Sequence, residues 1–203
     1  MTGQIPVEQY RLFIAFQVPE AIRKKMLCVQ RELQTFVPPG AIRWTKPEQF
    51  HLTLRFLGNV PSDSLSALQE AVRAVCVTAL PLHLYARGLG FFPNARSPRV
   101  VWVGINDGEN RLTALQSRIE SATGPFTSEP AGGYFAGHVT LGRFKQFKNL
   151  NVKELRVAAD KLKNQLFGGW TADEIEIMRS ELLETGPRHA PVASIRLGME
   201  VAH

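Results

Sequence analysis

Two short stretches of the chain carry the same pattern: HLTLRFLG at residues 51–58 and HVTLGRF at residues 138–144. Both are rich in aliphatic residues, which favours a β-strand in each place. Side chains alternate between the two faces of a strand, so the histidine and the threonine of each stretch share one face. The aliphatic residues occupy the other face. If the two strands lie close together, two imidazoles and two hydroxyls meet.

The polar residues of the two motifs are suited to acid–base chemistry on a phosphodiester. They are His51 and Thr53 in the first motif and His138 and Thr140 in the second. An imidazole titrates near neutral pH, so one histidine can activate a water while the other protonates a leaving oxygen. Threonine hydroxyls donate hydrogen bonds to phosphate oxygens, and no step needs a metal. The competing interpretation is two ordinary strands, each exposing one histidine, and the repetition of the motif argues against it.

The rest of the chain mixes strands and helices in an irregular order, which predicts an α+β fold. Each motif strand leads through a loop into a helix, so we expect two related halves that share one core in a single domain, residues 1–203. The predicted strands span residues 11–18, 50–57, 82–92, 99–105, 138–144, 171–182 and 194–201. The predicted helices span residues 19–36, a segment that follows Ser62 or Asp63, residues 110–122 and residues 152–166. The stretch ETGPRHAP, residues 184–191, is predicted to be a loop.

The composition of the chain indicates which kind of binding partner and which cellular compartment to expect. Hydrophobic residues make up 44% of the chain, and the net charge is +6 with a pI of about 9.6, which favours an anionic partner. Cys28 and Cys76 form no C-x-x-C pair, which argues against a cysteine zinc site and against a disulfide framework. The apolar run at residues 12–16 is too short for a signal peptide or a membrane span. We therefore expect a cytoplasmic protein without a membrane partner.

Several arginines are candidates for contacts with an anion. Arg143 lies on the face opposite His138 in an ideal strand, but a bulge or twist near Gly142 would turn it towards the phosphate. Arg55 shares the face of His51 by alternation and is a weaker candidate for a phosphate or backbone contact. A basic rim is a further possibility, with a solvated surface as the alternative; its residues are Arg87, Arg96 and Arg99.

Aromatic residues and the other histidines are less informative. Four aromatic residues are candidates for stacking on bases, with burial in the core as the competing interpretation: Trp44, Phe91, Phe92 and Trp102. His189 lies in the predicted loop at residues 184–191, which could bring it near the site. His83 lies in a strand without a partner motif, and His203 is terminal.

The residues quoted so far resemble a known family. The paired motifs are typical of the two-histidine phosphoesterase superfamily. Longer stretches resemble the bacterial RNA 2′,3′-cyclic phosphodiesterases, historically called 2′-5′ RNA ligases: PEQFHLTLRFLGNV, FFPNARSPRVVWVGI, GHVTLGRF and RSELLETGPRHAPVASIRL. The similarity covers residues 10–197. It implies a bilobal α+β fold in which two antiparallel sheets face a central cleft and the helices lie on the outside.

The resemblance also implies a reaction and a role for each residue. Family members hydrolyse a 2′,3′-cyclic phosphate at an RNA end to a 2′-phosphomonoester, with no cofactor and no metal. By position, His51 matches the proton donor and His138 the proton acceptor. Thr53, Thr140 and Arg143 match residues that bind the phosphate. The implied partner is an RNA with a cyclic phosphate end, and we expect a monomer.

Two positions depart from the family pattern, and two other functions stay open. Gly137 stands where the family usually has proline, which could loosen the entry into the strand, and His189 stands where it often has tyrosine. One alternative function is reversible 2′-5′ ligation of RNA, which would run without ATP because the chain has no P-loop. The other is a non-catalytic RNA-binding module.

Overall fold

The strands form two antiparallel sheets in the computed structural model, which describes residues 7–145, 152–183 and 186–198. The four-stranded sheet has the order β3 (His51–Pro61), β1 (Gln9–Gln17), β8 (Glu174–Leu183) and β9 (Gly186–Arg196). The five-stranded sheet has the order β2 (Ile42–Trp44), β6 (His138–Phe144), β5 (Val100–Asn106), β4 (Leu82–Phe92) and β7 (Leu166–Ala172). Each sheet therefore contains one of the two motif strands. The α+β class and the two antiparallel sheets expected from the sequence are confirmed.

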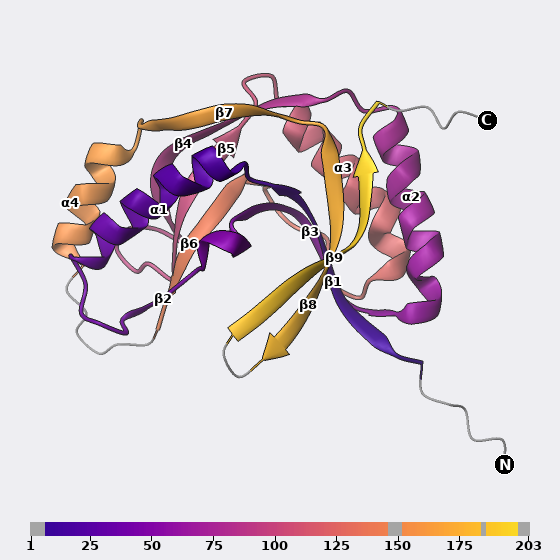
Figure 1. The fold of residues 1–203 in the computed structure, drawn as a ribbon, viewed down its shortest axis with the longest axis horizontal. Coiled ribbons are helices and arrows are strands. Elements are labelled where there is room, and N and C mark those ends of the chain that lie inside the picture. The colour runs from indigo at the N-terminus through magenta and orange to yellow at the C-terminus, as the bar shows by residue number, and fades with distance from the viewer. Residues whose placement is uncertain (1–6, 146–151, 184–185, 199–203) are drawn as a thin grey trace, which may run out of the picture.

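Helices cover the two sheets in pairs at opposite ends of the molecule (Figure 1). They are α1 (Glu20–Gln34), α2 (Leu65–Val77), α3 (Arg111–Thr123) and α4 (Lys153–Leu162). Helices α1 and α4 contact strands of the five-stranded sheet, whereas α2 and α3 contact each other and the four-stranded sheet. Helix α1 follows β1 directly in sequence but packs on the other sheet, so the chain crosses between the sheets at once. One continuous core includes residues of both sheets and all four helices.

An apolar stripe on α1 explains why this helix forms and which face it buries. Helical spacing in the sequence predicts that four residues face the core: Ile22, Met26, Val29 and Leu33. Ile22, Met26 and Leu33 are buried, and Val29 is half-buried. Gln30 lies on the same stripe and is buried as well, at 3% exposure. A buried amide needs hydrogen-bond partners, so Gln30 indicates a polar contact between α1 and the elements that it packs against.

Each motif strand contains a β-bulge at its leucine. In β3, Thr53 pairs with Ala15 and Arg55 pairs with Ile14, so Leu54 is an extra residue in the ladder. In β6, Thr140 pairs with Trp102 and Gly142 pairs with Val101, so Leu141 is the extra residue. Simple alternation therefore ends after the fourth residue of each motif, and the residues that follow change face.

Four predicted elements near the C-terminus need correction. The strand predicted at residues 194–201 begins earlier, at Gly186, and ends at Arg196, and residues 199–201 lie outside the described part of the chain. The helix predicted at residues 152–166 ends at Leu162, and β7 begins at Leu166 because it pairs with β4. The strand predicted at residues 171–182 is two strands in different sheets, which meet at Asp173.

The predicted loop at residues 184–191 is also wrong for its described part. Residues 186–191 belong to β9, where Arg188 pairs with Glu181 and His189 with Ser180. Pro187 and Pro191 are tolerated there because β9 is an edge strand, where a missing N–H breaks no ladder on the open side. The short strand β2 is a further element that the sequence pattern does not predict.

Candidate active site

The two motifs meet where β3 of one sheet contacts β6 of the other. His51 and His138 are close enough to act on each other electrostatically, and Arg143 acts on both. All four polar residues of the motifs are half-buried, while the aliphatic residues between them are buried in the core. The structure thus brings together the two imidazoles that the sequence placed in separate halves.

Both motif histidines are held by the same hydrogen bond. Nδ1 of His51 donates to the carbonyl of Gln49 at 2.7 Å, and Nδ1 of His138 donates to the carbonyl of Ala136 at 2.8 Å. A carbonyl oxygen only accepts, so Nδ1 carries a proton in each ring. Nε2 is then the nitrogen that gains or loses a proton in each imidazole. In each motif, the carbonyl two residues before the histidine thus selects the tautomer that leaves Nε2 available for proton transfer.

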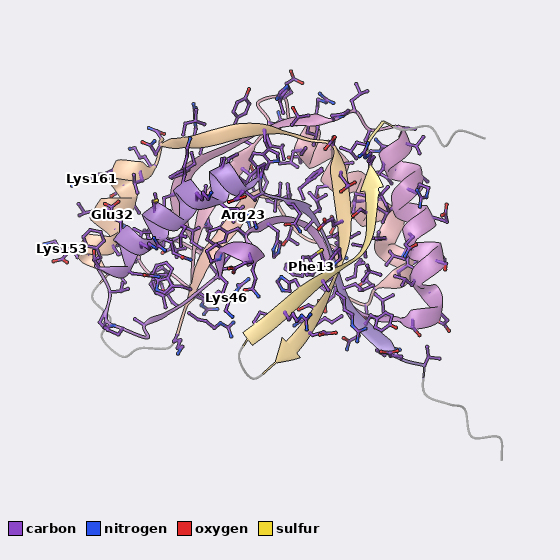
Figure 2. The ribbon with its side chains drawn as sticks, viewed as in Figure 1. Phe13, Arg23, Glu32, Lys46, Lys153 and Lys161 are labelled. Carbon is purple, nitrogen blue, oxygen red and sulfur yellow. The ribbon has the colours of Figure 1, made fainter. Side chains whose placement is uncertain are left out.

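Each motif histidine also belongs to a cluster of three rings in mutual contact. His51 lies 4.8 Å from Phe13 and 5.3 Å from His189 between ring centroids, and Phe13 and His189 are 4.9 Å apart. His138 lies 4.9 Å from Phe92 and 6.2 Å from Trp102, which are themselves 4.9 Å apart. Figure 2 labels Phe13 near the centre of the molecule, at the four-stranded sheet. These neighbours fix the orientation of each imidazole.

The surroundings make both imidazoles hard to protonate. Burial, followed by the neighbouring His189, lowers the pKa of His51 from 6.5 to about 4. Burial also lowers the pKa of His138, with a smaller contribution from Arg143. Both histidines are therefore neutral at pH 7 in the free protein. A bound phosphate would favour the protonated forms, because it brings a negative charge.

Buried glutamines hold the two bulges. The side chain of Gln30, on α1, donates to the carbonyls of Leu141 and Thr45, both at 2.8 Å. On α3, Gln116 is 6% exposed and donates to the carbonyl of Leu54 at 3.4 Å. The bulged leucine of each motif is thus anchored by an amide from the helix behind it. Neither glutamine is among the site residues predicted from the sequence, although an amide on an apolar helix stripe is a signal for such a role.

The bulge in β6 places Arg143 on the side of the histidines, as the expected bend near Gly142 requires. Val139 and Leu141 face the core, and after the bulge Phe144 packs there while Arg143 is exposed. Gly142 permits this geometry, because a Cβ there would lie 2.6 Å from Ile42 and 2.9 Å from Trp44. Arg43 on β2 lies directly opposite Arg143. Although the Arg143 residue as a whole is exposed, partial burial of its guanidinium, followed by the charge of Arg43, lowers the pKa of Arg143.

The same geometry overturns the expectation for Arg55. The bulge at Leu54 removes Arg55 from the face of His51, where alternation had placed it. Its side chain is buried, forms an ion pair with Glu120 of α3 at 2.8 Å, and donates to the carbonyls of Glu129 and Pro130. Arg55 therefore holds α3 and the segment before β6, and it is not a phosphate contact in this structure. Phe56, which is 53% exposed, lies beside Phe13 instead.

The remaining candidates divide between core and surface. Phe91 is buried and Trp44 packs against the core, whereas Phe92 and Trp102 surround His138. The three arginines of the expected rim are all exposed: Arg87, Arg96 and Arg99. His83 is exposed on β4.

The structure shows what surrounds Gly137 and His189, the two residues that depart from the family pattern. Gly137 does not loosen the strand entry: its carbonyl accepts a hydrogen bond from the Ile105 amide at 2.8 Å, and a Cβ would lie 2.5 Å from the Ile105 oxygen. His189 contacts His51 directly.

Comparison with protein families and curated proteins gives a consistent result. The model of the LigT-like phosphoesterases matches residues 16–102. An RNA 2′,3′-cyclic phosphodiesterase of Archaeoglobus fulgidus is 32% identical over 177 residues, which are 87% of this chain and 94% of the relative. One of Aquifex aeolicus is 26% identical over 189 residues, 93% of this chain and 97% of the relative.

Solved structures share the fold. A Thermus thermophilus protein superposes with a TM-score of 0.76 at 26% identity, covering 94% of this chain and all of that one. Escherichia coli LigT complexed with 3′-AMP gives a TM-score of 0.73 at 23% identity, covering 95% of this chain and 100% of that one. The likeness to E. coli LigT concerns the fold.

Proposed function

The chain belongs to the family of the RNA 2′,3′-cyclic phosphodiesterases, the LigT-like phosphoesterases, and we propose that it hydrolyses 2′,3′-cyclic phosphate ends of RNA to 2′-phosphomonoesters. One observation carries the proposal: two neighbouring imidazoles, each with Nδ1 tied to a backbone carbonyl, have Nε2 left for proton transfer. A cyclic phosphodiester needs one proton removed from water and one given to the leaving oxygen. The two histidines supply both, so we propose that no metal ion takes part.

The reaction follows from these assignments. Nε2 of His138 takes a proton from water as the water oxygen attacks phosphorus. The bond between phosphorus and the 3′ oxygen breaks, and Nε2–H of His51 gives its proton to that oxygen. The hydroxyls of Thr53 and Thr140 and the guanidinium of Arg143 bind the non-bridging oxygens, where negative charge grows in the transition state. The histidines then exchange a proton with solvent and return to their starting forms.

A pair of arginines supports a polynucleotide as the substrate. Arg43 and Arg143 lie opposite each other on β2 and β6, and like charges in that position destabilise a sheet. Within the described part of the chain, neither guanidinium forms an ion pair with a carboxylate. Strand β2 is at the edge of its sheet, so Arg43 is exposed beside the site. We assign Arg143 to the cyclic phosphate and Arg43 to the next phosphate along the RNA.

The direct test uses a short RNA with a 2′,3′-cyclic phosphate end, incubated with the protein in EDTA. We expect turnover to persist and the product to be a 2′-phosphate. His51→Ala and His138→Ala should each lower the rate by about 10²–10⁴-fold, the usual contribution of a general acid or base. His83→Ala is the matched control, because His83 is exposed on β4 away from either motif. Circular dichroism checks that each variant is folded.

Five outcomes would contradict the proposal. Loss of all activity in EDTA would require a metal, and a 3′-phosphate product would require the other bond to break. Normal rates in either histidine variant would remove the acid–base assignment. RNA binding without any product would favour a non-catalytic module, and joining of RNA ends in preference to hydrolysis would favour ligation.

We also propose that residues 1–203 form one bilobal domain that acts as a monomer. The core that runs through both sheets supports this, because a shared core couples the two halves on unfolding. Among the described residues, no helix is long and apolar enough to cross a membrane. A single thermal transition and a monomer mass by light scattering are the expected results. Two separate transitions, or a dimer mass, would contradict the proposal.

A further inference from the structure

The two ring clusters around the motif histidines differ in one respect. His138 is surrounded by Phe92 and Trp102, neither of which ionises. His51 is surrounded by Phe13 and by a second imidazole, His189, which meets it edge-on at 5.3 Å with an interplanar angle of 74°. The motifs are alike in sequence, in their hydrogen bonds and in their bulges. Among the rings that contact the two motif histidines in the described part of the chain, His189 is the one that ionises, and it contacts His51 alone of the pair.

A side-chain hydrogen bond and the pairing of β9 with β8 hold His189 in this place. Gln49, whose carbonyl accepts from His51, donates its side-chain amide to the carbonyl of Pro187. Pro187 lies two residues before His189 on β9, and His189 pairs with Ser180 of β8. One residue therefore ties both the His51 ring and the strand that carries His189.

His189 also has an unused polar atom. Nδ1 of His189 is buried, and nothing in the described part of the chain forms a hydrogen bond with it. An unpartnered buried nitrogen costs free energy, and such groups call for an explanation in their surroundings. A hydrophobic ring would fill the same space without that cost. The presence of an imidazole is thus not explained by packing.

We propose that His189 is a positioning residue for His51: it supports the His51 ring from one side and places a second ionisable group against it. Through this contact His189 sets the proton affinity of His51 apart from that of His138. The inference rests on the proposed function for its catalytic meaning, because only there do the two histidines have different tasks.

The electrostatic environment agrees with this role. Burial, and then Arg11 of β1, lowers the pKa of His189 itself. Among the neighbouring ionisable groups, His189 lowers the pKa of His51 most, and His138 and Arg143 of β6 lower it less. From β8, Ser180 pairs with His189, and its neighbours Arg179 and Glu181 pair with each other at 3.5 Å. A proton on His189 therefore adds to a field that is already positive, and it opposes a proton on His51.

The test measures the protonation of His51 directly. Imidazole nitrogens are followed by ¹H–¹⁵N NMR during a pH titration of the wild type and of His189→Gln, which keeps a polar side chain but cannot ionise. We expect the His51 midpoint to rise by about 0.5–2 pH units in the variant. Coulomb's law gives this range for two unit charges at the observed ring separation, between water-like and protein-like dielectric constants. The His138 midpoint should change much less.

Controls separate charge, packing and folding. His83→Gln removes an exposed histidine elsewhere and should leave the His51 midpoint unchanged. His189→Phe keeps a ring against His51 and Phe13, and it serves as the second variant if His189→Gln is poorly folded by thermal unfolding. In either folded variant, a His51 midpoint that stays the same or falls would overturn the proposal.

Kinetics link the result to catalysis. In His189→Gln, the limb of the pH–rate profile that His51 governs should move to higher pH by the same amount as its NMR midpoint. If the NMR shift occurs but the profile does not move, His189 has no catalytic role and the proposal fails. If the wild type hydrolyses no cyclic phosphate, the proposed function fails, and the NMR titration still decides whether His189 controls His51.

Discussion

At the scale of single residues, the proton affinity of the two motif histidines governs the chemistry. A general acid must carry its proton before the reaction and a general base must not. Burial lowers the pKa of both imidazoles, and His189 lowers that of His51 further, to about 4. A phosphate bound between them raises the pKa of each imidazole, because its negative charge favours the protonated form. Both imidazoles are therefore neutral in the free protein, and the pair gains a proton when an anion binds.

The pH dependence of kcat/KM follows from these values. His51, the proposed acid, loses its proton as the pH rises through about 4, whereas His138, the proposed base, is free of its proton above its lowered pKa. The product of the two active fractions is greatest below pH 6.5. We expect kcat/KM on cytidine 2′,3′-cyclic phosphate to peak on the acid side of neutrality and to fall about tenfold per unit at higher pH.

The measurement is a steady-state profile from pH 4 to 9, with circular dichroism at each pH as the control for folding. The profile of kcat should extend to higher pH than that of kcat/KM, because bound phosphate favours a protonated His51. A kcat/KM plateau that continues well above pH 7.5 would contradict the assignment.

At the scale of elements, the β-bulge at the leucine that follows each motif threonine decides which side chains reach the site. The bulges at Leu54 and Leu141 end the simple alternation, so they turn Arg55 away from the histidines and Arg143 towards them. Each bulged carbonyl is held by a buried glutamine from the helix behind the sheet. The helices thus support the geometry of the site as well as the core.

Removing the glutamine behind β6 tests this support. Gln30→Leu keeps the size of the side chain but leaves the carbonyls of Leu141 and Thr45 without that donor. We expect a loss of stability of about 1–3 kcal/mol, because the Thr45 carbonyl loses this donor and the Leu141 carbonyl keeps the Thr45 amide, at 2.9 Å, but loses the Gln30 amide. Because Arg143 follows the bulge directly, KM should also rise.

Gln34→Leu is the matched control for this experiment, because Gln34 is exposed at the end of the same helix. Urea unfolding gives the stability, and steady-state kinetics gives KM. A Gln30→Leu protein with normal stability and normal KM would show that the bulge needs no support from α1.

At the scale of the whole molecule, the two sheets combine groups that are far apart in the chain. One sheet contributes His51, Thr53 and His189, and the other contributes His138, Thr140 and Arg143. Arg43, on the edge strand of the second sheet, extends the positive charge beyond the motifs. The net charge of +6 agrees with an anionic substrate.

Arg43 should matter only for a substrate that has a second phosphate. Arg43→Gln is compared on cytidine 2′,3′-cyclic phosphate, which has one phosphate, and on a cytidine dinucleotide with a cyclic phosphate end. We expect kcat/KM for the dinucleotide to fall about tenfold, which corresponds to one charge-assisted hydrogen bond. The value for the mononucleotide should stay within about twofold.

Arg31→Gln serves as the control, since Arg31 is exposed on α1 and its loss changes the net charge equally. An equal loss on both substrates would place Arg43 at the cyclic phosphate itself. No loss on either would mean that Arg43 contacts no substrate phosphate.

The sequence by itself determined the local patterns of this protein. Strand alternation gave the shared face of histidine and threonine in each motif, and helical spacing gave the buried stripe of α1, because both depend only on neighbours in the chain. The tertiary structure decided the features that depend on pairing between segments far apart in the chain. A bulge exists only against a partner strand, so the sequence could not place Arg55. Strand β9 forms only by pairing with β8, so the sequence pattern indicated a loop at residues 186–191 and could not set the imidazole of His189 against that of His51.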